Sequence, residues 1–437
     1  MGIQDVVEIG AAVRAGRRRV DPVRRTDLTA AGLWVLAVVP QAFGFWLVAG
    51  DVAGVAPDEI RTLVLAALLT LAFATLLQVL LGYRMSVYEG PAASYLAALA
   101  VVSAGGAAGL AALTGGLIAA GVFVAALGAL GLDRLLRPLF TPVVATVFVL
   151  VLTLAVLPVT LSRAIGLADS APLGTAAAWA GSLAVLAAGI GLQRVPRLRP
   201  YALLGGLGLG AAVAIALGGA RPLDLSGGLA RPEALPWGAP EFGVGVVVPF
   251  LIAGLVAALN TIASIEVAAR ERRVPADAGA GRRGLMAHGA AQALGAVWGN
   301  LLGTVARLDS VAIVGILGNG RRMALALAAV AIFALAFVEP FLGLVAALPL
   351  SVSAAVLALI LGGLAIAALV RAWGYEPRIR WLVVAPALVP SLVWTPLSPS
   401  LSNTARLVAN PLVWGLLLGI VLERLVAPST AALAERR

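Results

Sequence analysis

The sequence lacks cysteine and lysine, and its 437 residues include one histidine, His288. Without cysteine there is no disulfide framework, no thiolate metal site and no cysteine nucleophile. A single histidine excludes a multi-histidine metal centre, and the lack of lysine excludes P-loop and Schiff-base lysine chemistry. Little remains from which an enzyme active site could be built. We therefore expect no catalytic residue, no metal ligand and no cofactor.

Charge is also scarce. Charged residues make up 12% of the chain, hydrophobic residues 61%, and the mean hydropathy is +1.02. Soluble domains have about 25% charged and about 45–50% apolar residues. The composition therefore predicts an all-α polytopic membrane protein whose main partner is the lipid bilayer. The formal charge of +10 does not indicate nucleic acid, because no basic domain lies outside the apolar segments.

Apolar segments recur along the chain. A spanning helix needs about 20 such residues to cross the hydrocarbon layer. We expect fourteen spans, at residues 28–50, 62–82, 91–105, 107–131, 138–158, 174–192, 201–219, 246–269, 284–302, 310–320, 323–346, 352–370, 381–395 and 407–422. The third and the tenth are too short to cross alone, and they occupy matching places in two halves of seven.

All 31 basic residues are arginines. Their distribution between the loops tests the orientation of the chain in the membrane. With the N-terminus in the cytoplasm, 25 arginines fall on the inner side and 6 outside or at depth. The positive-inside rule thus predicts two cytoplasmic termini. The basic, amphipathic segment 1–27 has no signal-peptide cleavage site and is expected to lie along the inner face of a bacterial plasma membrane.

Seven spans per half give the halves opposite orientations, and inverted repeats of this kind are a transporter architecture. The exterior loop 220–245 divides them. The short β-prone runs 85–91 and 303–309 precede the third and tenth spans. Irregular backbone at membrane depth must be enclosed by protein or a cavity, so the helix amino ends near Ala92 and Ser310 should face a common centre. Tilted or re-entrant spans are the alternative.

Several of these segments resemble those of a known transporter family. The run 74–96, ATLLQVLLGYRMSVYEGPAASYL, looks like the second and third spans of the nucleobase–ascorbate transporter family, the xanthine/uracil permeases. The stretch 283–289, the ninth span through Gly299 and the stretch 344–352 are similar to that family too. The similarity extends from about residue 30 to about residue 425, in the same order and spacing.

The resemblance implies a secondary transporter of a nucleobase-like small molecule, usually a homodimer, driven by protons or sodium. Its core domain would be spans 1–4 and 8–11, its gate domain spans 5–7 and 12–14, and the substrate would sit between the two short strands. The corresponding ranges are 28–131 and 246–346 for the core, 138–219 and 352–422 for the gate, and 423–437 for a cytoplasmic tail.

The chain departs from the family at its substrate-binding positions. Where the eighth span of the family has a glutamate, this sequence has Ala263 or Ser264. Glu266 lies two or three residues farther on and therefore on another helix face. In the tenth span the family's acid aligns with Leu308 or, shifted by one residue, with Asp309. The shifted register keeps an acid in place.

Several polar residues have two readings. Asp309 is either a site residue, because charge at the midplane is costly, or a helix cap. Asn260 and Ser264 share a helix face and bind either substrate or a neighbouring helix. Arg307 contacts an anion or neutralises Asp309. The candidate substrate-binding residues are Ala93, Ser94, Tyr95, Asn260, Ser264, Asp309 and Ser310; Asp309 and Glu266 are the coupling candidates, and Arg307 is the possible anion contact.

Five polar residues are given a structural role or a place in the fold. Glu266 precedes Arg270 by four residues, so an ion pair between them competes with the coupling role. Gln41 and Gln78 are expected to tie helices together. His288 adjoins the arginine-rich loop 270–283 and is expected at the membrane interface, a proton relay being the alternative, and Glu89 is expected near the inner edge.

A secondary transporter therefore explains the sequence better than a channel, which needs a continuous polar lining, or an enzyme. Nucleobases of the uracil, xanthine and urate class are the first expectation for the substrate. Another small anion, such as a carboxylate, ascorbate or a sulfate-like ion, is the alternative.

The arginine distribution generates a labelling prediction. The chain has no background thiol, so Gly228→Cys should react with an impermeant maleimide added outside intact cells, and Ala278→Cys should react only after the membrane is opened. The reverse pattern would overturn the orientation.

Overall fold

The computed structural model describes residues 23–104, 109–139, 141–167, 174–219, 221–271, 277, 279–397 and 411–426. Most of the basic segment 1–27 and of the tail 423–437 lies outside these residues. Within them, eight helices are long and apolar enough to cross a membrane. The protein is thus a mostly helical, multi-pass membrane protein.

The first half of the chain consists of helices and one short strand. Its elements are α2 (Arg25–Ala53), α3 (Ile60–Leu80), β1 (Glu89–Pro91), α4 (Ala93–Ala104), α5 (Leu110–Ala129), α6 (Asp133–Leu136), the 3₁₀ turn η1 (Arg137–Leu139), α7 (Pro142–Ala164), α8 (Ala176–Arg194), the 3₁₀ turn η3 (Arg199–Tyr201) and α9 (Ala202–Ala216). Thr141 and Thr175 cap α7 and α8 by accepting backbone N–H groups.

The second half follows a similar order. Its elements are α10 (Val244–Glu271), α11 (Ala280–Val297), β2 (Thr304–Ala306), α12 (Ser310–Leu317), α13 (Arg322–Ala336), α14 (Glu339–Ala346), α15 (Leu350–Trp373), α16 (Pro377–Ile379), the π-helical turn η4 (Arg380–Val384), α17 (Ala385–Leu397) and α19 (Pro411–Val426). Each of the runs expected to be β-prone contains a strand.

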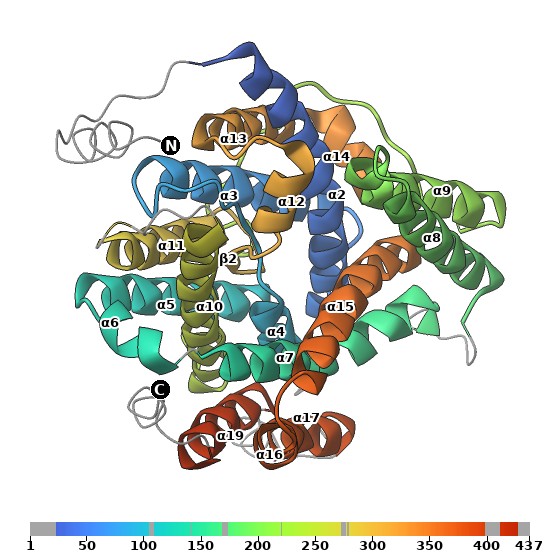
Figure 1. Ribbon diagram of the computed structural model, residues 1–437. Coiled ribbons are helices and arrows are strands. Elements are labelled where there is room, and N and C mark those ends of the chain that lie inside the picture. Colours follow the sequence, from blue (N-terminus) through green and yellow to red (C-terminus); the bar gives the residue numbers. More distant parts are fainter. Residues whose placement is uncertain are drawn as a thin grey trace.

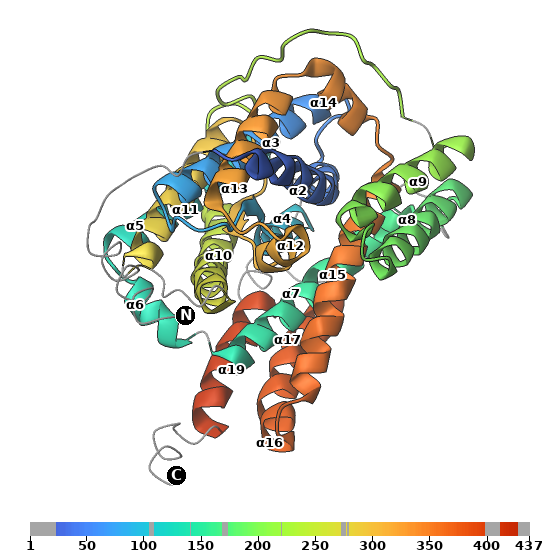
Figure 2. The ribbon, with the colours of Figure 1, turned by 45° about the horizontal axis from the view of Figure 1, so that its top comes forward.

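The helices pack in two groups. In the first, α11 lies between α3 and α5, α13 packs on α2 and α3, and α10 crosses α5 and packs on α4 (Figure 1). In the second, α7 packs on α15, α17 and α19, and α8 packs on α9 and α15; Figure 2 shows this group along the right and lower part of the molecule. The groups meet where α2 packs on α15 and where α4 packs on α7.

The expected span 323–346 is wrong as one continuous helix. It is broken between α13 and α14 at Phe337 and Val338. Pro340 lies in the first turn of α14, where its missing N–H costs nothing, whereas in a continuous helix its ring would clash with the carbonyl four residues earlier, at Ala336. The loop between α9 and α10 fills the break, because Ala230 donates its N–H to the Phe337 carbonyl and Leu229 bridges to Val338.

Close contact between α5 and α11 depends on glycine. A Cβ at Gly289 would collide with the Gly121 carbonyl and the Ala125 amide of α5, and one at Gly121 would lie 2.6 Å from the Ala293 amide. Small residues of this kind allow two membrane helices to approach backbone to backbone.

Replacing Gly289 with alanine should therefore destabilise the protein, by about 1–3 kcal/mol for an overpacked contact. The measurement is the thermal unfolding midpoint in detergent. Gly191→Ala in α8 is the matched control, because a Cβ there meets no atom within 4 Å and the change improves helix propensity. Equal midpoints for the two variants would contradict the glycine contact.

Candidate functional site

The two short strands pair with each other at the centre of the first helix group. β1 and β2 are antiparallel, with Glu89 opposite Ala306 and Pro91 opposite Thr304. The pairing continues on both sides, since Arg307 donates its N–H to the Tyr88 carbonyl and Ala92 donates to the Gly303 carbonyl. Two interrupted spans thus satisfy each other's backbone, and α4 and α12 begin directly after the strands.

The strands present different side chains on their two faces, because successive residues of a strand point in opposite directions. Tyr88 and Arg307 share one face; a Cβ added at Gly90, between them, would lie 2.8 Å from the Tyr88 ring and 3.0 Å from Arg307. Glu89 and Ala306 are on the opposite face. We call these the front and the back face.

The front face carries an ion pair. Arg307 donates from Nη2 to Asp309 Oδ2 at 3.1 Å and from Nε to Oδ1 at 3.3 Å. The Tyr88 hydroxyl also donates to Asp309 Oδ2, at 3.1 Å, and Gln41 Nε2 donates to the Tyr88 hydroxyl at 2.6 Å. The side chains of Arg307 and Asp309 are 11% and 29% exposed. We call Gln41, Tyr88, Arg307 and Asp309, with Ser310, the front cluster.

The surroundings of the front cluster fix its geometry. Ser310 accepts the Tyr88 N–H through its hydroxyl at 3.1 Å. The Arg307 guanidinium lies 5.6 Å from the centre of the Phe45 ring and donates to the Pro91 carbonyl. Asp309 occupies the N-cap position of α12, but its side chain makes no capping hydrogen bond. Its carboxylate is used by Arg307 and Tyr88 instead, so Arg307 does neutralise Asp309.

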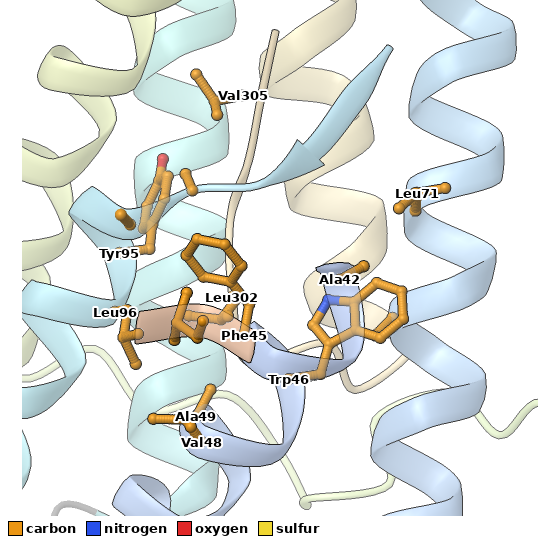
Figure 3. Close-up of a cluster of buried hydrophobic side chains, with 14 of the residues drawn as sticks. Ala42, Phe45, Trp46, Val48, Ala49, Leu71, Tyr95, Leu96, Leu302 and Val305 are labelled. Carbon is orange, nitrogen blue, oxygen red and sulfur yellow. The ribbon is translucent and has the colours of Figure 1, made fainter. Parts of the chain in front are cut away.

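The candidates Ser94 and Tyr95 on α4 have partners outside the front cluster. Ser94 donates to the Ala253 carbonyl of α10 at 3.2 Å. Tyr95 is fully buried, with its ring 6.1 Å from that of Phe250 and against Gly303, where a Cβ would collide with it. Figure 3 shows Tyr95 beside the strands together with Phe45 and Val305. Ala93 is also buried in this apolar cluster.

The candidate residues on α10 lie in three different environments. Ser264 is buried and donates to the Ala306 carbonyl of β2 at 2.8 Å, so it positions the strand. Asn260 is half-buried. Glu266 forms the expected i,i+4 pair with Arg270, at 3.9 Å, and its side chain is 35% exposed. The structure therefore brings Asp309, Ser310 and Arg307 together and leaves Glu266 apart from them.

The structure encloses His288 and Glu89 within the protein. Both side chains are 0% exposed, and their Nδ1 and Oε2 atoms are 3.6 Å apart. α11 begins at Ala280, so His288 lies more than two turns inside it. Gln78 does tie helices together, since its Nε2 donates to Glu89 and to the Gly284 carbonyl of α11.

The front cluster lies where the two helix groups meet. α12 contacts α2 and α10 of the first group and η3 of the second, and α4 contacts α7 of the second. Both half helices that follow the strands therefore border the boundary. A partly exposed ion pair at such a boundary, within a multi-pass membrane fold, makes the front cluster the candidate functional site.

Comparison with known proteins agrees with this class. The family model of the xanthine/uracil permeases, described as the permease family, matches residues 31–373. The chain belongs to this family, which confirms the resemblance seen in the sequence. A search of curated proteins gives no match.

Solved structures show the same fold. The transmembrane domain of BicA, a cyanobacterium bicarbonate transporter, superposes with a TM-score of 0.65 at 16% identity, covering 88% of this chain and 96% of that one. Murine Slc26a9, an anion transporter in the inward-facing state, gives 0.61 at 14% identity, covering 96% and 72%. A second SLC26A9 structure gives 0.60 at 16% identity, covering 97% and 69%. The family and these neighbours identify the protein as a membrane transporter rather than an enzyme.

The geometry of the front cluster predicts coupling between Arg307 and Asp309. Arg307→Gln and Asp309→Asn should each destabilise the protein, because each leaves a partly buried charge without its partner. The double variant should recover part of the loss. A double-mutant cycle of unfolding free energies should give about 1.5–3 kcal/mol, the range for hydrogen bonds to charged groups. Additive effects of the two single substitutions on the unfolding free energy would show that the ion pair contributes nothing to stability.

Proposed function

We propose that the protein is a proton-coupled secondary transporter of a nucleobase-like substrate of the uracil, xanthine and urate class. One observation carries the proposal: the Arg307–Asp309 pair is partly exposed at the junction of two interrupted spans. Charged side chains at such depth are expensive and are retained mainly for function. Substrate would bind there, against the amino ends of α4 and α12.

We further propose that transport proceeds by movement of the first helix group, as a core domain, against the second, as a gate domain. The division of helix contacts into two groups supports this, as does the position of α4 and α12 at their boundary. The antiparallel pairing of β1 and β2 supports an inverted relation between the halves of a fourteen-span fold. A homodimer in a bacterial plasma membrane, with both termini cytoplasmic, completes this proposal.

The polar groups at the front cluster indicate which class of substrate would bind there. Asp309 offers acceptor oxygens to the N–H groups of a nucleobase, and the backbone N–H groups at the amino ends of α4 and α12 offer donors to its carbonyl groups. Because Arg307 and Asp309 neutralise each other, the cluster as a whole suits a neutral ligand with both donors and acceptors. Ser310 and Asn260 are the further candidate contacts in this proposal.

A small anion is the second candidate. Arg307 and the amino ends of two half helices all favour negative charge, and no eighth-span glutamate opposes it. Two structural neighbours are a bicarbonate transporter and an anion transporter. An anion would have to displace Asp309 from Arg307, so binding would cost the energy of that pair.

Competition uptake distinguishes the two candidates. If the substrate is a neutral nucleobase, uracil and hypoxanthine should compete for uptake, whereas urate, ascorbate and carboxylates should not. Arg307→Gln should then change the apparent affinity little. For an anionic substrate, the same variant should weaken binding by about 1.5–3 kcal/mol, as expected for loss of a charge-assisted hydrogen bond.

Coupling is tested with Asp309→Asn. If Asp309 binds substrate or its co-ion in alternation with a proton, this variant should lose accumulation driven by a pH gradient while the protein stays folded. Glu266→Gln is the matched control and should be milder, because Glu266 pairs with Arg270 away from the front cluster. Full gradient-driven uptake by Asp309→Asn would reduce Asp309 to a structural residue.

A further inference from the structure

The back face of β1 carries a second polar cluster that is sealed from solvent. Glu89 Oε2 lies 3.6 Å from His288 Nδ1, and both side chains are 0% exposed. Gln78 Nε2 donates to Glu89 Oε1 at 2.9 Å. The Tyr83 hydroxyl lies 3.5 Å from the same oxygen and donates to the Val87 carbonyl at 2.8 Å. We call Gln78, Tyr83, Glu89 and His288, with Thr261, the back cluster.

The back cluster contains unused hydrogen-bonding capacity. Glu89 Oε2, His288 Nε2 and Gln78 Oε1 are buried without a hydrogen-bond partner. Among the residues that the structure describes, no arginine lies within ion-pair distance of Glu89. A lone carboxylate or a lone imidazolium would be costly in such surroundings. One proton held between Glu89 and His288 makes the pair neutral overall, and removing that proton leaves a buried negative charge.

None of the other described groups around the pair balances the negative charge of Glu89. Tyr83 belongs to the segment between α3 and β1, and Tyr95 of α4 has a buried hydroxyl without a partner. Thr261 comes from α10 and Thr304 from β2. On α11 itself, Arg283 is paired with Asp277 at 2.5 Å and donates to the Gly82 carbonyl. Glu89 and His288, with Oε2 and Nδ1 3.6 Å apart, are therefore the two groups of this cluster that can share one proton.

Hydrogen bonds link the back cluster to both strands. The Thr261 hydroxyl lies 3.2 Å from His288 Nδ1 and accepts the Ala306 N–H of β2 at 3.4 Å. Thr75 of α3 accepts the Glu89 N–H at 3.1 Å and donates to the Glu89 carbonyl at 3.3 Å. Tyr88, the neighbour of Glu89 in sequence, contacts Asp309 on the front face. A change of charge behind β1 therefore acts one residue away from the proposed substrate site.

We propose that Glu89 and His288 form a buried proton-binding site that couples the proton to transport through β1. The proposal rests on the proton-coupled function proposed above and adds the residues that hold the proton. The site lies on the back of the strand, so the proton and the substrate occupy opposite faces of the same element. His288 lies about 12 Å along α11 from Ala280, the end that follows the arginine-rich loop.

The single histidine provides a direct test. With ring-¹⁵N-labelled histidine and a tag without histidine, every imidazole signal in the NMR spectrum comes from His288. We expect its nitrogen shifts to change between pH 5 and pH 9 in the wild-type protein. The change should vanish or move by more than one pH unit in Glu89→Gln, and it should persist in Asp309→Asn, which alters the front cluster alone.

Thr75→Val is the matched structural control for this measurement. It removes hydrogen bonds to the Glu89 backbone and leaves the carboxyl group in place. Its imidazole shifts should keep their pH dependence even where its stability falls. Shifts that do not depend on pH in the wild-type protein, or that depend on it equally in Glu89→Gln, would overturn the proton site.

Transport in proteoliposomes gives the second measurement, with radiolabelled uracil and xanthine as the probes. One pH unit can drive about tenfold accumulation when one proton accompanies one substrate. Glu89→Gln should lose this accumulation and keep counterflow exchange, which needs no net proton movement. His288→Gln should behave in the same way. Full accumulation by Glu89→Gln would overturn the inference.

The two proposals can fail separately. If the wild-type protein exchanges substrate but accumulates none with a pH gradient, the proton coupling of the proposed function is wrong. A pH-dependent imidazole signal that requires Glu89 would still support Glu89 and His288 as a proton-binding site. If Glu89→Gln does not fold, His288→Gln in the transport assay and the wild-type imidazole titration decide the question.

Discussion

The antiparallel pairing of β1 and β2 is the constraint on which the rest of the structure depends. Backbone polar groups at membrane depth must be satisfied by protein, and two interrupted spans can do this only with each other or with a cavity. Six paired residues bring two distant parts of the chain together, with Glu89 opposite Ala306. Because α4 and α12 begin directly after the strands, this pairing also fixes the amino ends of both half helices.

The paired strands also separate two pairs of ionisable side chains, one on each face. On the front face Arg307 neutralises Asp309, and both side chains remain partly exposed. On the back face Glu89 lies beside an imidazole and, within the described part of the chain, has no arginine partner; both groups are buried. An ion pair that reaches the boundary between helix groups is suited to a ligand, whereas a sealed acid–imidazole pair is suited to a proton. Adjacent residues of one strand, Tyr88 and Glu89, connect the two.

The sequence predicted the membrane class, the family and the short strands, because apolar length and interrupted spans are local features. It predicted a local partner, Arg270 for Glu266, but not the partners that distant segments supply. Tyr95 was expected at the site, but its packing on Gly303 depends on a contact between distant segments. The burial of His288 beside Glu89 likewise depends on segments far apart in the chain. The enclosure of the run 85–91 was a usable signal for Glu89, since an acid in a segment surrounded by protein must be buried.

The central claim is that a nucleobase-like substrate binds at the front cluster, beside Asp309. The most direct measurement is a thermal-shift screen of the purified protein and of Asp309→Asn against nucleobases, urate, ascorbate and small carboxylates. A ligand at one hundred times its dissociation constant stabilises the folded state by about 2.7 kcal/mol. We predict that a nucleobase stabilises the wild-type protein and that Asp309→Asn loses this effect. Equal stabilisation of both proteins, or stabilisation by carboxylates alone, would contradict the account.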